Sequence, residues 1–208
     1  MTCDRRLVDR VCYWGGDSSR SYRNHRIIKG EIMEPFLPRV VALSGFAQSG
    51  KDTSYEFGLK PHGYKRVAMA DKLKAEVAYA FGVDVETINE NKTLWRPMLV
   101  SWGELRRAHD PQYWIKRVFA QMNDTCRYCI TDARYYNECC EVLSKGGRVY
   151  IIKNPNGVAA NETEAASVAK VELELAPVAI INDSTKEMLG SRLWEAVSSK
   201  LRWEMGTK

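Results

Sequence analysis

The segment Gly45–Thr53, with the sequence GFAQSGKDT, directly follows the apolar run Val40–Leu43. A loop of this composition brings several backbone N–H groups and the positive end of a helix dipole to one point, which suits a di- or triphosphate. Lys51 stands where its ammonium group reaches the β- and γ-phosphates. The pattern favours a strand, a phosphate loop and a helix over a simple glycine turn followed by a surface lysine.

We expect the phosphate loop to bind ATP through Gly45, Gln48, Ser49, Gly50, Lys51, Asp52 and Thr53. Asp52 occupies the position after the lysine, where such loops usually carry the Ser or Thr that binds Mg²⁺. A carboxylate also binds Mg²⁺, directly or through water. The sequence therefore predicts that Asp52 or Thr53 contributes to a magnesium site.

Strand and helix signals alternate from residue 39 onward, which is typical of a parallel sheet with crossover helices. Strands are expected at 40–44, 64–70, 127–131, 148–152 and 178–181, and helices at 50–59, 71–81, 95–108, 111–122, 137–145 and 185–201. Asp110 is the expected N-cap of the helix at 111–122. The prediction is an α/β fold: a three-layer α/β/α sandwich with a five-stranded parallel sheet of the P-loop NTPase type.

Polar residues follow several of the expected strands. In open parallel sheets, ligands bind beyond the carboxyl ends of the strands. Asp71, Asp132 and Lys153 stand at such ends, beside the phosphate loop. Asp71 could position an acceptor or a metal-bound water, or cap the helix that follows it. Asp132 is placed where P-loop enzymes often carry an acid that binds Mg²⁺.

The composition fits one enzyme-sized domain. The chain has 208 residues, of which 45% are hydrophobic and 27% charged. We expect a poorly ordered basic extension at residues 1–38 and a P-loop domain at 39–208. The sequence contains neither an apolar run long enough to span a bilayer nor the apolar segment of a secretory leader. A cytoplasmic protein without a membrane partner is therefore the expectation.

The extension carries mixed charge. Residues 1–40 contain eight Lys or Arg residues and five acidic residues, and the whole chain has a net charge of +5. Without a dense basic run, this arm does not predict a nucleic-acid partner.

The six cysteines predict free thiols in a reducing compartment. A zinc site is the alternative, formed by Cys126, Cys129 and the pair Cys139–Cys140. Adjacent cysteines do not easily face one tetrahedral metal, and Cys126 and Cys129 lie on an expected strand.

Five motifs occur along the chain in an ordered set: GFAQSGKDT, MADKLK (69–74), WGELRRAHDPQYW (102–114), ITDARYYNE (130–138) and IINDS (180–184). Their order resembles that of the bacteriophage deoxynucleoside monophosphate kinases, over about residues 39–200. The resemblance implies transfer of the γ-phosphoryl group of ATP to a (deoxy)nucleoside 5′-monophosphate. It also implies ATP and Mg²⁺ as cofactors, and the host cytoplasm as the location if a phage encodes the chain.

Residue by residue, the resemblance and the charge that such an acceptor carries suggest roles for the remaining polar side chains. The expected catalytic residues are Lys51, Asp71, Arg107, Asp132 and Arg134, and the expected acceptor ligands are Asp71, Lys74, Arg106, Arg107, Arg134 and Lys153. Arginine suits this task because it binds phosphate with two parallel hydrogen bonds. Because neighbouring helix residues do not share a face, only one of Arg106 and Arg107 is expected to point inward. The resemblance favours Arg107.

The segment at about 153–170 corresponds to the lid of such kinases. Residues 153–168 are polar and small, which predicts a mobile surface segment ahead of a short helix with Val171, Leu173 and Leu175. The lid contains Lys153 and Lys170 but no arginine.

Two other functions remain open. One is a P-loop kinase for another small metabolite, such as dephospho-coenzyme A. The other is a non-catalytic nucleotide-binding protein whose basic arm contacts nucleic acid. The sequence leaves the oligomeric state open, with a homodimer as one option.

Overall fold

A computed structural model describes residues 37–159 and 162–199, so most of the predicted extension at 1–38 lies outside the described residues. The strands are β1 (Val40–Ser44), β2 (Tyr64–Val67), β3 (Arg127–Ile130), β4 (Arg148–Lys153) and β5 (Val178–Ile181). They form one parallel sheet in the order β2-β3-β1-β4-β5. The predicted five-stranded parallel sheet is confirmed.

Strand β1 lies at the centre of the sheet, and all five of its residues are buried. Val40 and Ala42 face one hydrophobic cluster, whereas Val41 and Leu43 face another. A strand covered on both faces needs a continuous apolar run, which explains why VVAL shows no polar alternation.

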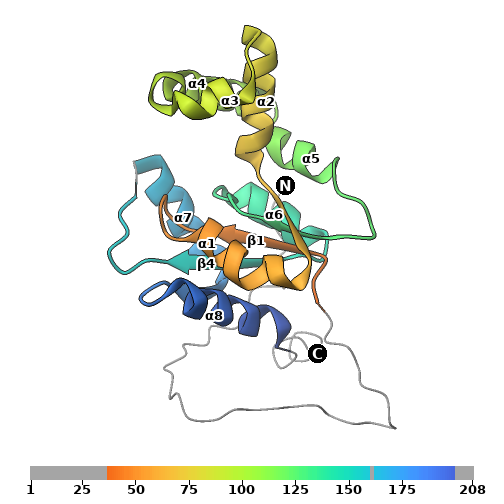
Figure 1. The fold of residues 1–208 in the computed structure, drawn as a ribbon, viewed down its shortest axis with the longest axis vertical. Helices are drawn as coiled ribbons and strands as arrows, with labels where there is room; N and C mark the ends of the chain where they lie inside the picture. The colour runs from red at the N-terminus through yellow and green to blue at the C-terminus, as the bar shows by residue number, and fades with distance from the viewer. Residues whose placement is uncertain (1–36, 160–161, 200–208) are drawn as a thin grey trace.

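Helices cover both faces of the sheet and complete the three layers (Figure 1). One face packs against residues of α5 (Tyr113–Phe119), α6 (Tyr136–Ser144) and α7 (Glu162–Leu175). The other packs against α8 (Lys186–Ser198) and the helical segment after the phosphate loop. That segment begins as α1 (Lys51–Ser54) and continues as a π-helix at Tyr55–Leu59 and a 3₁₀ turn at Lys60–His62.

The segment after the phosphate loop packs closely on α8 through two glycines. A Cβ atom on Gly58 would lie 2.6 Å from the carbonyl oxygen of Gly190, and one on Gly190 would lie 2.5 Å from the backbone of Phe57. The helix predicted at 50–59 is present from Lys51 onward, but its second half is a π-helix.

Three helices, α2 (Met69–Phe81), α3 (Val85–Glu90) and α4 (Lys92–His109), project beyond the carboxyl end of β2, at the top of Figure 1. Their own small core contains Val77, Ala78 and Ile88. The sequence did not predict α3. Asp84 caps it by accepting a hydrogen bond from the amide of Thr87 at 2.6 Å.

Several predicted boundaries were wrong. Asp110 is the C-cap of α4, and Gln112 is the N-cap of α5, although the Asp110 carboxylate accepts the Gln112 amide at 3.0 Å. Residues 162–168, predicted to be a mobile segment, lie within α7, where Val168 and Val171 are buried. No helix in the described part of the chain is long and apolar enough to cross a membrane.

Candidate active site

The phosphate loop follows β1 and depends on two glycines in the left-handed region. Gly45 has a φ of 126°, and a Cβ atom there would lie 2.3 Å from the carbonyl oxygen of Ile152. Gly50 has a φ of 104°, and a Cβ atom there would lie 2.5 Å from Nδ2 of Asn182. The Asn182 amide donates to the carbonyl of Ser49 at 2.9 Å, so the loop after β5 supports the phosphate loop. The IINDS motif therefore marks a residue that holds the loop, a role that sequence reasoning missed.

Lys51 lies across this loop and is buried. Its Nζ donates to the carbonyl oxygens of Gly45 at 2.8 Å and Phe46 at 2.6 Å. Burial lowers the pKa of Lys51 to about 8, and the positive charge of Arg134 contributes. The predicted lysine therefore lies inside the phosphate loop with its ammonium group directed at the loop carbonyls.

Asp52 is joined to Asp71 by a residue that sequence reasoning missed. Arg66, at the carboxyl end of β2, donates through Nε to Asp52 at 3.2 Å and through a terminal nitrogen to Asp71 at 2.6 Å. The prediction that Asp71 ends the second strand was wrong, because β2 ends at Val67 and α2 begins at Met69. It is an exposed first-turn residue of α2 on the same side as the phosphate loop.

The N-terminus of α2 is capped by Asp132. Its two carboxylate oxygens accept the amides of Met69 at 2.9 Å and Ala70 at 2.8 Å. Burial raises the pKa of Asp132, while these two hydrogen bonds oppose the shift. Asp132 thus performs the capping role that the sequence suggested for Asp71.

The neighbouring residues Arg106 and Arg107 point in different directions, as the helical spacing predicts. Arg106 pairs with Glu76, and its guanidinium carbon lies 5.2 Å from the ring centre of Tyr113. It therefore belongs to a polar cluster between α2, α4 and α5. Arg107 lies over the ring of Tyr135, with 4.3 Å between the guanidinium carbon and the ring centre.

Glu138 joins Arg107 to the segment after β3. Its side chain is buried, and Oε2 accepts the amides of Arg134 and Tyr135, each at 3.0 Å. Arg107 lies 3.8 Å from the other oxygen, Oε1. Burial raises the pKa of Glu138 to about 7. One buried carboxyl group therefore contacts the side chain of Arg107 and the backbone amide of Arg134.

The two predicted lysine ligands have other partners. Lys74 donates to Asn89 of α3 at 2.7 Å, within the projecting helices. Lys153 pairs with Glu172 of α7 at 2.8 Å. Lys153 nevertheless lies near the phosphate loop. It lines a cavity of about 330 Å³ with the loop residues Gly45 and Phe46 and with Ile152, Val168 and Glu172.

Glu164 of α7 reaches the phosphate loop and was not predicted. Its Oε1 accepts the amide of Ala47 at 3.1 Å and lies 3.3 Å from a terminal nitrogen of Arg134. The Glu164 side chain is only 5% exposed. No local sequence pattern could have placed it there, since 117 positions separate it from Ala47.

The residues that could hold Mg²⁺ are oxygen-bearing residues of the phosphate loop. In the described residues, no three His, Cys, Asp or Glu side chains gather in a group that could hold a metal ion. Mg²⁺ in phosphoryl-transfer sites takes one or two protein ligands, with phosphate and water completing its shell. The exposed Asp52 and the adjacent Thr53 fit that requirement. Asp132 fits it less directly, because both of its oxygens already accept backbone amides.

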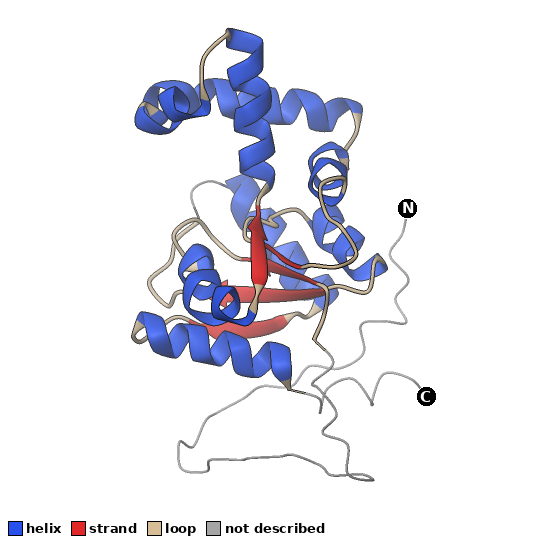
Figure 2. Ribbon diagram, turned by 45° about the vertical axis from the view of Figure 1, so that its right-hand side comes forward, coloured by secondary structure: helices blue, strands red, loops and turns tan. Residues whose placement is uncertain are grey.

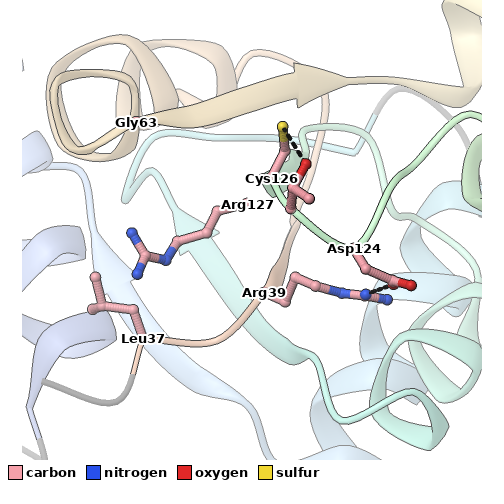
Figure 3. A pocket seen from close by; sticks show the side chains of 7 residues that line it. Leu37, Arg39, Gly63, Asp124, Cys126 and Arg127 are labelled. Carbon is pink, nitrogen blue, oxygen red and sulfur yellow. Dashed lines mark hydrogen bonds and ion pairs between the residues drawn. The ribbon is translucent and has the colours of Figure 1, made fainter.

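A second pocket lies at the opposite edge of the sheet, where β2 and β3 begin (Figure 3). It has a volume of about 380 Å³ and is lined by Leu37, Arg39, Gly63, Asp124, Thr125, Cys126 and Arg127. Cys126 is half-buried there, whereas Cys129 and Cys139 are buried, and all are free thiols. The cysteines Cys3 and Cys12 lie outside the described residues. This pocket is separate from the phosphate loop.

The strand order, the phosphate loop after β1 and the helices on both faces define a three-layer α/β fold of the P-loop NTPase type (Figure 2). No known family profile matches the sequence. One curated protein, the uncharacterized protein ORF76 of Ictalurid herpesvirus 1 (strain Auburn), is 23% identical over 140 residues. The match covers 65% of this chain and 56% of that protein, so the chain spans little more than half of its relative.

Among solved structures, a dephospho-CoA kinase from Campylobacter jejuni matches 76% of this chain and 95% of its own, with 13% identity and a TM-score of 0.43. TT1252 from Thermus thermophilus matches 77% and 96%, with 15% identity and a TM-score of 0.42. A sugar kinase from Janibacter sp. HTCC2649 matches 77% and 96%, with 16% identity and a TM-score of 0.32. Similarities of this size assign no substrate to this chain.

Proposed function

We propose that the protein is an ATP- and Mg²⁺-dependent kinase that phosphorylates a deoxynucleoside or nucleoside 5′-monophosphate. The observation that supports this proposal is a series of contacts that links two arginines to the phosphate loop. Glu138 contacts the side chain of Arg107 and the backbone amide of Arg134, and the Arg134 side chain pairs with Glu164, which accepts the amide of Ala47. Two arginines beyond the loop lysine suit an acceptor that is itself a phosphate.

The donor nucleotide would be held by the phosphate loop. Lys51 and the loop amides would contact the β- and γ-phosphates, and Asp52 and Thr53 would hold Mg²⁺. When bound, Mg²⁺ would neutralise charge on the phosphate oxygens. Phosphoryl transfer then requires little beyond positioning and charge neutralisation.

The acceptor would lie between the phosphate loop and the first turn of α2. Arg107 and Arg134 would bind its phosphate, and Asp71 would orient it from α2. An ionised phosphate attacks without a strong general base, so no buried base is needed. The exposed Asp71, already paired with Arg66, suits an orienting role.

A kinase for a hydroxyl acceptor, such as dephospho-coenzyme A, is the second candidate. It is favoured by the position of Asp71, a carboxylate in the first turn of α2 that could accept a proton from a hydroxyl group. Asp71→Asn distinguishes the two functions. We expect the variant to retain much of its activity on a nucleotide phosphate, whereas transfer to a hydroxyl group would be nearly abolished.

The experiment is a comparison of acceptors under identical conditions. The purified protein receives ATP, Mg²⁺ and one acceptor at a time from two chemical groups, nucleoside monophosphates and hydroxyl acceptors that include dephospho-coenzyme A. Diphosphate formation from a monophosphate supports the proposal. Phosphorylation of a hydroxyl acceptor alone would replace it with the second candidate.

A further inference from the structure

The carboxylate of Glu164 lies where an anion would bind the phosphate loop. Its Oε1 accepts the backbone amide of Ala47 at 3.1 Å and pairs with Arg134 at 3.3 Å. A loop amide and a guanidinium group are the donors that a phosphate oxygen would use. The same two donors therefore now hold a carboxylate of the protein itself.

This placement is fixed by packing. Val168 and Val171 of α7 are buried against the sheet, and the hydroxyl of Ser167 donates to the carbonyl of Arg134 at 2.8 Å. The helix that carries Glu164 is thus fastened to the same segment as Arg134. Burying a carboxylate is costly unless it is paired and hydrogen-bonded, and here the phosphate loop and Arg134 supply those partners.

We propose that Glu164 occupies the site of a terminal phosphate oxygen and competes with the nucleotide for Ala47 and Arg134. This inference rests on the proposed function, because it requires a nucleoside triphosphate as the ligand. A carboxylate and a phosphate cannot share these donors without strong repulsion. Glu164 must therefore withdraw when the triphosphate binds, and it lowers the affinity of the protein for ATP.

The test compares ATP binding, by titration calorimetry with Mg²⁺, in the full-length protein and in Glu164→Gln. The variant keeps the size of the side chain and removes its charge. If the carboxylate fills the site nine-tenths of the time, the dissociation constant for ATP falls by roughly tenfold in the variant. Glu162→Gln is the matched control, because Glu162 is exposed in the same turn of α7. We expect it to change the dissociation constant by less than about twofold, as surface substitutions usually have small effects.

The thermal stability of the nucleotide-free proteins provides a second readout. A purely structural residue would, on substitution, weaken both stability and ATP binding. The proposal predicts instead that ATP binding becomes tighter while the melting temperature stays the same or falls. If Glu164→Gln does not fold, Glu164→Asp shortens the side chain by one methylene group and should also tighten binding.

Equal or weaker ATP binding by the folded variants would overturn the competition. That outcome is distinct from a failure of the proposed function, since a wild-type protein that binds no ATP would refute the function itself. Tighter binding in Glu164→Gln and not in Glu162→Gln would support the inference, whatever the acceptor.

Discussion

The ammonium group of Lys51 donates a 2.8 Å hydrogen bond to the carbonyl oxygen of Gly45, six residues earlier in the same loop. The buried lysine therefore stabilises the loop through its own hydrogen bonds in the nucleotide-free protein. The arrangement links the charge of one side chain to the conformation of the whole phosphate loop.

Replacing Lys51 with Met should weaken ATP binding. The aliphatic stem is kept, whereas the charge and its hydrogen bonds are lost. Charge-assisted hydrogen bonds contribute about 1.5–3 kcal/mol each, so we expect affinity to fall by roughly 10²-fold. Titration calorimetry measures the change. Lys60→Met, at an exposed lysine nine residues away, is the control and should bind ATP normally. Normal binding by Lys51→Met would contradict the assignment.

The pH dependence of ATP binding should reflect the lowered pKa of Lys51, about 8 in the folded, nucleotide-free protein. As pH rises through that value, the ammonium group loses its proton and binding should weaken. The effect of Lys51 on folding stability has the opposite dependence on pH. Because its pKa is lower in the folded protein than the unfolded value of 10.5, Lys51 contributes stability above pH 10.5, and this contribution is lost as pH falls through about 8. Lys51→Arg stays charged, so its ATP affinity should change little over this range. If ATP affinity depended on pH in the same way in the wild type and in Lys51→Arg, the titration of Lys51 would not be the cause.

Gly45→Ala should destabilise the fold. The substitution combines a φ of 126° with a Cβ atom 2.3 Å from the carbonyl oxygen of Ile152. We expect a loss of about 2–4 kcal/mol in the free energy of unfolding, measured with urea. Gly63→Ala is the matched control, because Gly63 has a φ of 80° but open space around it. There we expect about 1 kcal/mol. Equal losses at the two positions would show that the contact with β4 is unimportant.

Two neighbouring arginines should give different phenotypes. Arg107→Met should raise the KM for the acceptor by roughly 10²-fold while ATP binding is retained, because charged hydrogen bonds to phosphate are lost. Arg106→Met should instead lower the free energy of unfolding by about 1–3 kcal/mol, because Glu76 loses its hydrogen-bonded ion pair with Arg106. Steady-state kinetics and urea unfolding of both variants separate these effects. The reverse pattern would show that Arg106 faces the acceptor.

Glu138 should make stability depend on pH. Its folded pKa is raised from 4.5 to about 7, so its stabilising contribution is fully present below pH 4.5 and is lost as pH rises through about 7. Glu138→Gln cannot ionise, and its unfolding free energy should lack this decline. Urea unfolding across that interval measures the difference. An identical decline in the variant would assign the titration to another group.

The sheet could be predicted because parallel strands buried on both faces require uninterrupted apolar runs, such as the one before Gly45. The phosphate loop could be predicted because its glycines and lysine lie within one short segment. Helix α3 was missed because its six residues, VETINE, contain too few apolar positions for a helical period. The start of α2 was misplaced because its cap, Asp132, comes from a distant part of the chain.

The candidate site was predictable only where its residues are close in sequence. Arg66 and Glu164 contact the phosphate loop from β2 and α7, and no local pattern distinguishes them from surface charges. Arg107 was favoured over Arg106 by the family resemblance, yet its partner Glu138 was expected only as part of the helix at 137–145. Glu138 lies in the first turn of that helix, but its carboxylate also joins the backbone amides of Arg134 and Tyr135 to the side chain of Arg107.

The central claim is tested most directly by phosphoryl transfer from γ-labelled ATP. The purified protein, with Mg²⁺, is offered each deoxynucleoside and nucleoside monophosphate, and the labelled products are separated. We expect a labelled diphosphate from at least one of them, and none from Lys51→Met. ATP binding without a labelled diphosphate from any monophosphate would contradict the proposed function.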